Sequence, residues 1–273
     1  MYSVCHWKGN YMIEMPEKIK SILGSSIGNS DTVGMSEASI LLFEDKVLKI
    51  QRVCDESKNE RDVMLWLKDK LPVPEVICHE IYNGQSYLLM LKLSGVMACD
   101  ESYLARPQEL TEILATGLKM LWDTDISKCP YNFSLDKKLE MARYNVEHEL
   151  VDTNNVEPDT FGENGFQSPA HLLDWLEHNR PEEDYVFSHG DFCLPNIFIE
   201  NGKISGFLDL GKTGYADRYQ DIALCYRSLK HNYEGKYGGK IYTGFNANSL
   251  FDKLELEPDW DKIRYYTLLD ELF

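Results

Sequence analysis

The stretch that decides the fold runs from Val186 to Gly211 and reads VFSHGDFCLPNIFIENGKISGFLDLG. Three short segments in and around it, YVFS, NIFIE and KISGFLDL, have the β-branched and aromatic residues of strands. Asn201–Gly202, between the second and the third, is a favoured two-residue hairpin turn. The polar sequence His189-Gly190-Asp191 directly follows the first strand, and Asp209 lies at the end of the third. The stretch therefore predicts a small β region with polar side chains at its strand ends.

The spacing of these polar residues predicts phosphoryl transfer. Asn196 follows Asp191 by five residues, and Asp209 follows it by eighteen. In kinases, an aspartate accepts the proton of the attacking hydroxyl, and an asparagine five residues later and a further aspartate hold Mg²⁺. Each residue alone would be interpreted as a turn residue. As an ordered set they favour Asp191 as the catalytic base and Asn196 and Asp209 as metal ligands, with His189 a packed, hydrogen-bonded neighbour.

A second pair of residues lies upstream. Lys49 ends the predicted strand VLKI, and Glu60 follows eleven residues later in a predicted helix. A strand lysine that contacts the nucleotide phosphates and is oriented by a helix glutamate is the arrangement found in kinases. The pair is weak evidence alone, because Lys and Glu are ordinary surface residues, and it gains weight from its place before the His-Gly-Asp sequence.

A competing motif overlaps the same stretch. Residues 206–213, GFLDLGKT, match the phosphate-loop pattern G-x-x-x-x-G-K-T. The four intervening residues continue a strand, however, and cannot wrap phosphates with free backbone N–H groups. Asp209 would also face the phosphate without a metal between them. The phosphate-loop interpretation is therefore rejected.

The order of the predicted elements gives the fold class. Residues 38–91 contain ASILLFEDKVLKI, two strands joined at Glu44–Asp45, then the helix NERDVMLWLKDK, then the hairpin EVICHEIYNGQSYLLML. Helical patterns dominate from residue 107, and the chain closes with RYQDIALCYRSLKHN and DKIRYYTLLDELF. Strands first and helices second predict an α+β chain of two lobes, a strand-rich one at 1–93 and a mainly helical one at 94–273.

The charge is concentrated in the second predicted lobe. The 273 residues carry 28 Lys and Arg against 45 Asp and Glu, a net charge of −17, of which −15 falls in residues 94–273. Such a chain repels nucleic acid and anionic lipid and attracts cations, although simple solubility also explains acidity. We find no signal peptide or membrane span, and the seven cysteines form no Cys-x-x-Cys pair. A reduced cytoplasmic protein is expected, a monomer or weak dimer.

These residues carry a resemblance to a known family. The chain resembles the aminoglycoside 3′-phosphotransferases, antibiotic kinases with a protein-kinase-like fold, from about residue 30 to residue 273. The resemblance is densest in NERDVMLWLKDKLPVP, in VFSHGDFCLPNIFIENGKISGFLDLGKTGYADRYQDIALCYRSL and in PDWDKIRYYTLLDELF. The first and the last separate this family from choline kinases and other small-molecule kinases.

The resemblance implies roles for further residues. Ser36 would lie in a nucleotide-positioning loop, and the backbone from Met90 to Leu93 would form the hinge that binds adenine. The acceptor would be a cationic aminoglycoside, whose ammonium groups would contact the acidic loop near 157–163 and the C-terminus with its free carboxylate. The implied substrate-binding residues are Glu157, Asp159, Glu163, Lys212, Asp270, Glu271 and Phe273.

Three departures from the family pattern affect these expectations. Val47 stands where relatives can carry an aromatic that stacks on adenine, so either ATP or GTP is expected as donor. Lys212 stands where relatives can carry Arg, which removes a bidentate contact. Residues 155–167 align poorly, which leaves the individual carboxylates there unassigned.

The sequence thus predicts an ATP- and Mg²⁺-dependent kinase that phosphorylates the 3′-hydroxyl of an aminoglycoside of the kanamycin or neomycin type and confers resistance. Two alternatives stay open. One is a kinase of the same fold that acts on another small hydroxylated molecule, since only the acceptor pocket would differ. The other is an inactive relative that binds nucleotide or drug without turnover.

Overall fold

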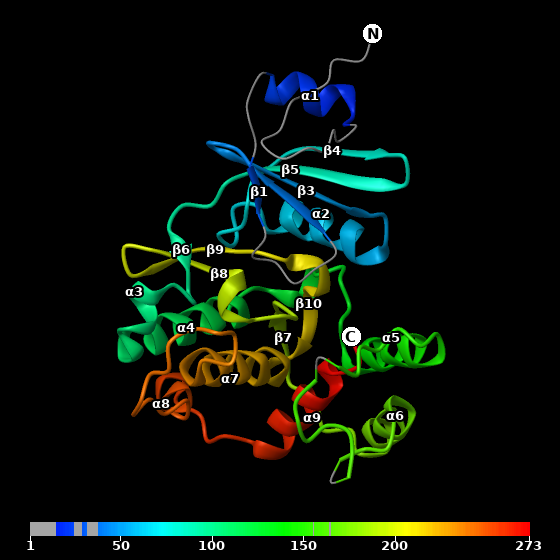
Figure 1. The fold of residues 1–273 in the computed structure, drawn as a ribbon, viewed down its shortest axis with the longest axis vertical. Coiled ribbons are helices and arrows are strands. Elements are labelled where there is room, and N and C mark those ends of the chain that lie inside the picture. Colours follow the sequence, from blue (N-terminus) through cyan, green and yellow to red (C-terminus); the bar gives the residue numbers. More distant parts are fainter. Residues whose placement is uncertain (1–14, 25–28, 32–37, 155, 164) are drawn as a thin grey trace.

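The structure is a computed structural model that describes residues 15–24, 29–31, 38–154, 156–163 and 165–273. Ser36, the residue predicted for the nucleotide-positioning loop, lies outside the described residues. Figure 1 shows a sheet with two flanking helices at the N-terminal end and a larger, mainly helical part below it. The predicted α+β class is confirmed.

The N-terminal sheet is antiparallel throughout, with the strand order β1-β2-β3-β5-β4. The hairpin predicted for EVICHEIYNGQSYLLML is present, and so is the connection between the two predicted strands at Glu44–Asp45. Asn83 and Gly84 have φ of 49° and 75°, the left-handed backbone that a two-residue hairpin turn requires. The strands are β1 (Asn29–Asp31), β2 (Ser39–Leu42), β3 (Lys46–Arg52), β4 (Val76–Tyr82) and β5 (Gln85–Leu91).

Two predicted boundaries in this region are wrong by a few residues. Strand β3 does not end at Lys49 but continues to Arg52, because the last residues of β3 pair with the start of β5. Helix α2 (Asp55–Leu67) begins four residues before the predicted Asn59. Its start is set by Cys54, whose Sγ accepts the Ser57 N–H while the Ser57 hydroxyl accepts the Cys54 N–H. In this reciprocal cap a cysteine stands where Ser, Thr, Asp or Asn is usual.

The alternation of side chains along the strands separates two apolar layers. Leu48 and Leu89 face α1 (Glu17–Leu23), and with it they form a small core on one side of the sheet. Leu88 and Met90, one residue out of step, face α2 and join the main core. Figure 1 shows α1 and α2 on opposite faces of this sheet. The strand that carries Lys49 is therefore held from both sides.

The C-terminal part contains two small sheets and most of the helices. Strand β6 (Val96–Met97) pairs with β8 (Ile197–Glu200), which pairs with β9 (Lys203–Phe207), and β7 (Tyr185–Ser188) pairs with β10 (Gly214–Asp217). The chain leaves the N-terminal sheet at Leu91 and joins the β8 sheet at Val96, so the predicted division between residues 93 and 94 falls in this connection. The helices are α3 (Glu101–Leu104), α4 (Pro107–Trp122), α5 (Leu135–Glu147), α6 (Pro169–His178), α7 (Arg218–Glu234), α8 (Ser249–Leu254) and α9 (Trp260–Asp270).

The last helix is shorter than predicted. Helix α9 ends at Asp270, and Glu271 to Phe273 lie beyond it. Figure 1 shows the C-terminus in the middle of the molecule, next to the start of α5. Glu271 and Leu272 are buried and Phe273 is partly buried.

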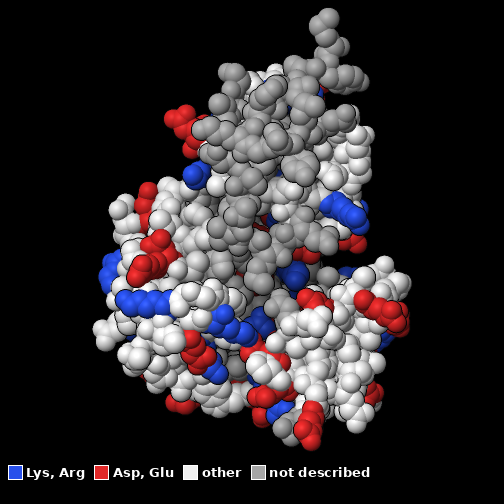
Figure 2. All heavy atoms as spheres, viewed as in Figure 1, with Lys and Arg blue, Asp and Glu red and all other residues white. Residues whose placement is uncertain are grey.

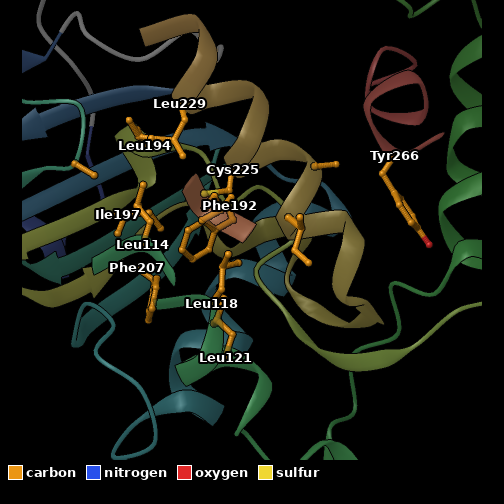
Figure 3. Packing of buried hydrophobic residues seen from close by; sticks show 14 of the residues in the cluster. Leu114, Leu118, Leu121, Phe192, Leu194, Ile197, Phe207, Cys225, Leu229 and Tyr266 are labelled. Atoms are coloured by element: carbon orange, nitrogen blue, oxygen red, sulfur yellow. The ribbon is translucent and has the colours of Figure 1, made fainter. Parts of the chain in front are cut away.

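A core of leucine and aromatic side chains packs against the loop between β7 and β8, which carries Asp191. Leu114 and Leu118 of α4 and Cys225 of α7 surround the fully buried Phe192, which directly follows Asp191 (Figure 3). Gly117 lets α4 approach this ring, since a Cβ there would lie 3.2 Å from Phe192 Cζ. The position of the loop is therefore set by packing as well as by its own hydrogen bonds.

Two further expectations concern cysteines and membrane spans. All six cysteines among the described residues are free. Among the helices that the structure describes, none combines the length and the apolar character that crossing a bilayer would need.

Candidate active site

The loop between β7 and β8 brings Asp191 and Asn196 together. A 3₁₀ turn (Leu194–Asn196) reverses the chain, and Asn196 Nδ2 donates to Asp191 Oδ2 and to the Asp191 carbonyl, both at 3.0 Å. The Leu208 N–H donates to the Asn196 carbonyl at 2.8 Å, which ties this loop to the segment that carries Asp209. The three residues predicted from spacing therefore share one region of the structure.

A buried carboxylate fixes the start of this loop. Asp221 of α7 accepts the N–H groups of His189 and Gly190 at 2.8 and 2.9 Å and is fully buried. Gly190 has φ of 84°, and a Cβ there would lie 2.0 Å from the Lys212 carbonyl oxygen, so only glycine fits. Burial raises the pKa of Asp221, although its two backbone donors act in the opposite direction. Asp221 thus holds the peptide groups that precede Asp191.

His189 is packed, as predicted. Its ring is fully buried between Phe192 and Phe207, with centroid distances of 6.0 and 6.1 Å. Nδ1 accepts the Asp191 N–H at 3.3 Å, and Nε2 has no partner among the described residues. The ring therefore supports the loop, and nothing in its contacts suggests that it reaches a substrate.

Lys49 links the strand, the helix and the third polar residue. Its Nζ donates to Glu60 Oε1 at 2.9 Å and to Asp209 Oδ1 at 2.8 Å. Burial alone would lower the pKa of Lys49, but the two carboxylates raise it above its ordinary value. The same ion pair lowers the pKa of Asp209 despite burial. The site therefore holds a charged lysine beside an ionised aspartate.

Asp209 has a strained backbone that its surroundings maintain. It adopts φ and ψ of 58°, unusual for a residue other than glycine. Asn59 of α2 donates to the carbonyls of Gly211 and Thr213 at 2.8 and 3.1 Å, so the helix that carries Glu60 is bonded to the turn that follows Asp209. Gly206 and Phe207 lie in β9, and a 3₁₀ turn follows. This order confirms that GFLDLGKT is not a phosphate loop.

A cleft of about 260 Å³ opens between these groups and the N-terminal sheet. Lys49, Glu60, Asn196 and Asp209 line its polar end. The apolar remainder includes Ile40, Leu42, Val47, Met64, Met90, Leu93, Met97, Phe198 and Leu208. This cleft is apolar along one part and carries Lys49 and the side-chain oxygens of Asn196 and Asp209 at one end. Such a cleft suits a nucleotide, in which a planar base is joined to a phosphate chain.

The predicted hinge offers less backbone than expected. The N–H groups of Leu91 and Lys92 donate to the carbonyls of Glu75 and Asp45 at 2.9 and 3.0 Å. Leu93 N–H has no backbone acceptor among the described residues, and the Leu93 side chain packs against Gly206, where a Cβ would lie 2.3 Å from it. Of the N–H groups of Leu91, Lys92 and Leu93, in the described part of the chain, only that of Leu93 lacks a backbone acceptor.

A second cleft, of about 230 Å³, collects some of the predicted substrate-binding residues. Glu157, Asp270, Glu271 and Phe273 line it. Asp159 and Glu163 are exposed and are absent from its lining. Of the three carboxylates predicted in the acidic loop near 157–163, Glu157 lines this cleft, and Asp152, five residues before it, lines it as well. We call this cleft, with Arg227, His231 and Lys236, the C-terminal pocket.

Three carboxylates of the C-terminal pocket already have an internal cation, whereas Asp152, which also lines it, accepts hydrogen bonds from Asn154. Arg227 of α7 bonds to Asp270 and, at 3.3 Å, to Glu271, and Lys236 donates to Glu157 at 2.8 Å. Burial raises the pKa of Glu271 to about 7, whereas Arg227 and Lys212 hold the pKa of Asp270 below its ordinary value despite burial. Figure 2 shows basic and acidic side chains interspersed on the face in view.

Two lysines lie over the last aromatic ring. Lys212 Nζ is 5.2 Å and Lys138 Nζ 5.8 Å from the centroid of Phe273. Lys138 of α5 is only 5% exposed, and burial together with Lys212 lowers its pKa to about 8. Lys212 is also attracted by Asp191 and Asp270, which raise its pKa although burial opposes this. Lys212 therefore lies between the first cleft and the C-terminal pocket.

Sequence analysis missed several residues of the site. Asp221 had a usable signal, because a charged residue inside the apolar pattern of RYQDIALC indicates a buried, partnered carboxylate. Lys138, Arg227, His231 and Lys236 had none, since lysines, arginines and histidines at such spacings usually face solvent.

Comparison with known proteins gives concordant results. Residues 44–266 match the model of the phosphotransferase enzyme family. A protein described as an aminoglycoside 3′-phosphotransferase from Enterococcus faecalis is 41% identical over 256 residues, 89% of this chain and 92% of that protein. A protein with the same description from Staphylococcus aureus is 41% identical over 255 residues, with the same coverage.

Solved structures support the same fold. A crystal structure of an aminoglycoside 3′-phosphotransferase of type VIII superposes with a TM-score of 0.77 at 24% identity, over 90% of this chain and 94% of that one. An aminoglycoside phosphotransferase from Streptomyces rimosus, in complex with ADP and streptomycin, has a TM-score of 0.77 at 23% identity, over 93% and 95% of the two chains.

Proposed function

We propose a role for each site residue from the premise that this chain belongs to the aminoglycoside 3′-phosphotransferase family. Its reaction is the transfer of a phosphoryl group to the 3′-hydroxyl of an aminoglycoside, which confers resistance to the antibiotic. Phosphorylation adds bulk and between one and two negative charges to a ligand that acts as a polycation. In our proposal the nucleotide lies between lobes 1–93 and 94–273.

The donor is a nucleoside triphosphate bound in the 260 Å³ cleft. Its base would lie beside Val47 and Met90 and accept a hydrogen bond from the Leu93 N–H. Lys49 would contact the phosphates, oriented by Glu60. The paired contact of Lys49 with Glu60 and Asp209 is the observation that carries this proposal, because it aligns strand, helix and metal-binding segment as phosphoryl transfer requires. Val47 gives no aromatic stacking, so we propose ATP as donor with GTP also accepted.

The donor set fits Mg²⁺. Asn196 donates through Nδ2 to Asp191, which leaves its Oδ1 available, and Asp209 supplies an ionised carboxylate. The described residues contain no cluster of three or more His, Cys, Asp and Glu that could hold a metal by itself. Two protein oxygens suit an ion that completes its shell with phosphates and water. When bound, Mg²⁺ would neutralise charge on the phosphate oxygens.

Asp191 would orient the 3′-hydroxyl and accept its proton. The bond from the γ-phosphorus to the bridging oxygen breaks as the bond to the 3′-oxygen forms, and the nucleoside diphosphate leaves. Asn196 fixes the carboxylate through Oδ2, so that Oδ1 can face the acceptor. Lys212, between Asp191 and Asp270, would attract the transferred group electrostatically. The protein supplies alignment and charge, and the proton moves to one carboxylate.

The acceptor would bind in the C-terminal pocket. Glu157, Asp270, Glu271 and the Phe273 carboxylate would face its ammonium groups, and Lys212 would lie beside the reacting ring. Asp159 and Glu163 stay candidates for the rim, because both are exposed and could attract a polycation from outside. We propose kanamycin- and neomycin-type drugs as acceptors.

The test is nucleotide consumption by the purified protein with kanamycin and with an analogue that lacks the 3′-hydroxyl. We expect consumption with kanamycin only, and its loss when Mg²⁺ is removed by a chelator. Consumption with both acceptors would mean that the phosphoryl group is transferred to a hydroxyl other than the 3′-hydroxyl. Consumption with neither, under ATP or GTP, would favour another acceptor or an inactive relative. Consumption that survives the chelator would remove the metal role from Asn196 and Asp209.

A further inference from the structure

Glu157, which we expect to bind a substrate ammonium, is already occupied. Its Oε1 accepts from Lys236 Nζ at 2.8 Å and lies 3.0 Å from His231 Nε2. Burial lowers the pKa of His231, with smaller effects from its neighbours, so the ring is neutral near pH 7. Burial favours a neutral Glu157, but the hydrogen bond from Lys236 and nearby cations hold its pKa below the ordinary value. The charge that faces the ionised Glu157 is therefore that of Lys236.

The turn after α7 presents Lys236 to the pocket. Gly235 caps the helix in the left-handed region, with φ of 72°, and Lys236 N–H returns to the His231 carbonyl at 3.0 Å. Gly238, with φ of 78°, continues the turn. The Tyr237 hydroxyl lies 3.1 Å from His231 Nδ1 and holds the turn from the other side. The backbone of this turn therefore directs the lysine inward.

The two internal cations of the C-terminal pocket differ in how firmly they are held. Arg227 bonds to both Asp270 and Glu271, and its side chain is 19% exposed. Lys236 bonds to one carboxylate and lies 3.3 Å from His231 Nε2, and the side chains of Lys236 and Glu157 are 39% and 29% exposed. An ion pair that solvent reaches to this extent is weak. An incoming ammonium could displace Lys236, whereas Arg227 would stay in place.

We propose that Lys236 is a specificity-determining residue, an internal competitor that occupies the Glu157 subsite with the same chemical group as the substrate, an alkylammonium. This inference rests on the proposed function, because it assumes that the C-terminal pocket binds the acceptor. An acceptor that places an ammonium at Glu157 must displace Lys236. Its apparent affinity is therefore its intrinsic affinity multiplied by the fraction of molecules in which Lys236 is not bound to Glu157. An acceptor with a hydroxyl there leaves the lysine in place.

The primary test compares two lysine substitutions by calorimetry with kanamycin and a non-hydrolysable ATP analogue. Lys236→Gln should lower the kanamycin Kd about threefold to tenfold. Lys230→Gln is the matched control, because Lys230 is an exposed lysine near the end of the same helix and its loss changes the net charge equally. The control should change Kd by less than about twofold. Lys236→Arg, which keeps the charge, should bind nearly as the wild type does.

A double-mutant cycle sharpens the result. Glu157→Gln should weaken kanamycin binding more in the Lys236→Gln background than in the wild type, where the lysine already neutralises the carboxylate. Equal Kd changes for Lys236→Gln and Lys230→Gln, weaker binding in Lys236→Gln, or an additive cycle would each overturn the inference. Wild-type protein that neither binds nor phosphorylates kanamycin would instead contradict the proposed function.

Discussion

The two clefts of this protein are built in different ways. In the first, Asp191 and Asn196 come from one loop of eight residues, and Asp209 follows on the next hairpin. In the C-terminal pocket, Glu157, Arg227 and Glu271 come from three segments that are far apart in sequence. The first cleft depends on backbone hydrogen bonds and buried rings. The second depends on ion pairs between side chains.

The electrostatics of the two clefts also differ. In the first cleft, Lys49 is paired with two carboxylates, Glu60 and Asp209, and the second of these is the proposed metal ligand. In the C-terminal pocket, Arg227 and Lys236 already pair with Asp270, Glu271 and Glu157, the side-chain carboxylates proposed to bind a cationic acceptor. In our proposal Lys49 keeps Glu60 as its partner when it contacts the phosphates. Glu157, in contrast, must exchange Lys236 for an ammonium of the acceptor.

The largest expected effect tests the first cleft. Asp191→Ala should reduce turnover by about 10³-fold, because a general base contributes about 10² to 10⁴ and the variant also loses the bond to Asn196. Nucleotide binding should stay within about twofold, since Lys49 and its partners are unchanged. Single-turnover kinetics and calorimetry with the ATP analogue measure the two quantities.

Asp191→Asn is the control for shape in that experiment. It keeps the size of the side chain but cannot accept a proton, and it should be nearly as inactive as the alanine variant. Turnover close to that of the wild type in either variant would remove Asp191 from the proposed role and leave the loop a structural feature.

The first cleft could be predicted from sequence because its geometry is local. A strand, a tight loop and a hairpin fix the distances between Asp191, Asn196 and Asp209, and a glycine at 190 and a turn at 201–202 mark the bends. The kinase-like spacing also drew attention to Lys49 and Glu60. The structure places all five beside one another, and only the strand end and the helix start were misjudged.

The C-terminal pocket could not be predicted in the same way. Which carboxylate faces inward depends on how residues 150–165 lie against α7 and α9, and nothing in the local pattern distinguishes Glu157 from Asp159 or Glu163. The local pattern did not predict the internal cations Arg227 and Lys236 either, for the same reason. Net charge predicted an acidic surface, but charge counts do not show which side chains pair.

The next effect tests how the loop is held. Asp221→Asn should lower kcat by about tenfold or more, because the amide would turn a donor toward the His189 or Gly190 N–H and leave it unpaired. We also expect a loss of about 1–3 kcal/mol in the free energy of unfolding. Nucleotide affinity, measured well below the unfolding temperature, should change little. A stability loss with unchanged kcat would mean that Asp221 is structural and does not position Asp191.

The chain end allows a test of the C-terminal pocket. Deletion of Phe273 should raise the acceptor KM by about tenfold, because it removes the ring beside Lys138 and Lys212 and shifts the terminal carboxylate to a buried leucine. The nucleotide KM should change by less than about twofold. Steady-state kinetics with each substrate varied in turn give both values. Equal increases in the acceptor KM and the nucleotide KM would mean that Phe273 affects both clefts, and would weaken the distinction between them.

The last prediction concerns Glu271, a carboxylate of the C-terminal pocket that is paired inside the protein. Burial raises the pKa of Glu271 to about 7 from an ordinary value of 4.5, so protonation favours the folded state. This contribution to stability is complete below pH 4.5 and is lost as the pH rises through 7. Urea unfolding should therefore show the wild type losing about 1–3 kcal/mol between pH 5 and 8 relative to Glu271→Gln, which cannot ionise. Parallel curves for the two proteins would mean that Arg227 keeps Glu271 ionised throughout. The acceptor pocket would then be as preorganised as the donor cleft, and the distinction between them would rest on Lys236 alone.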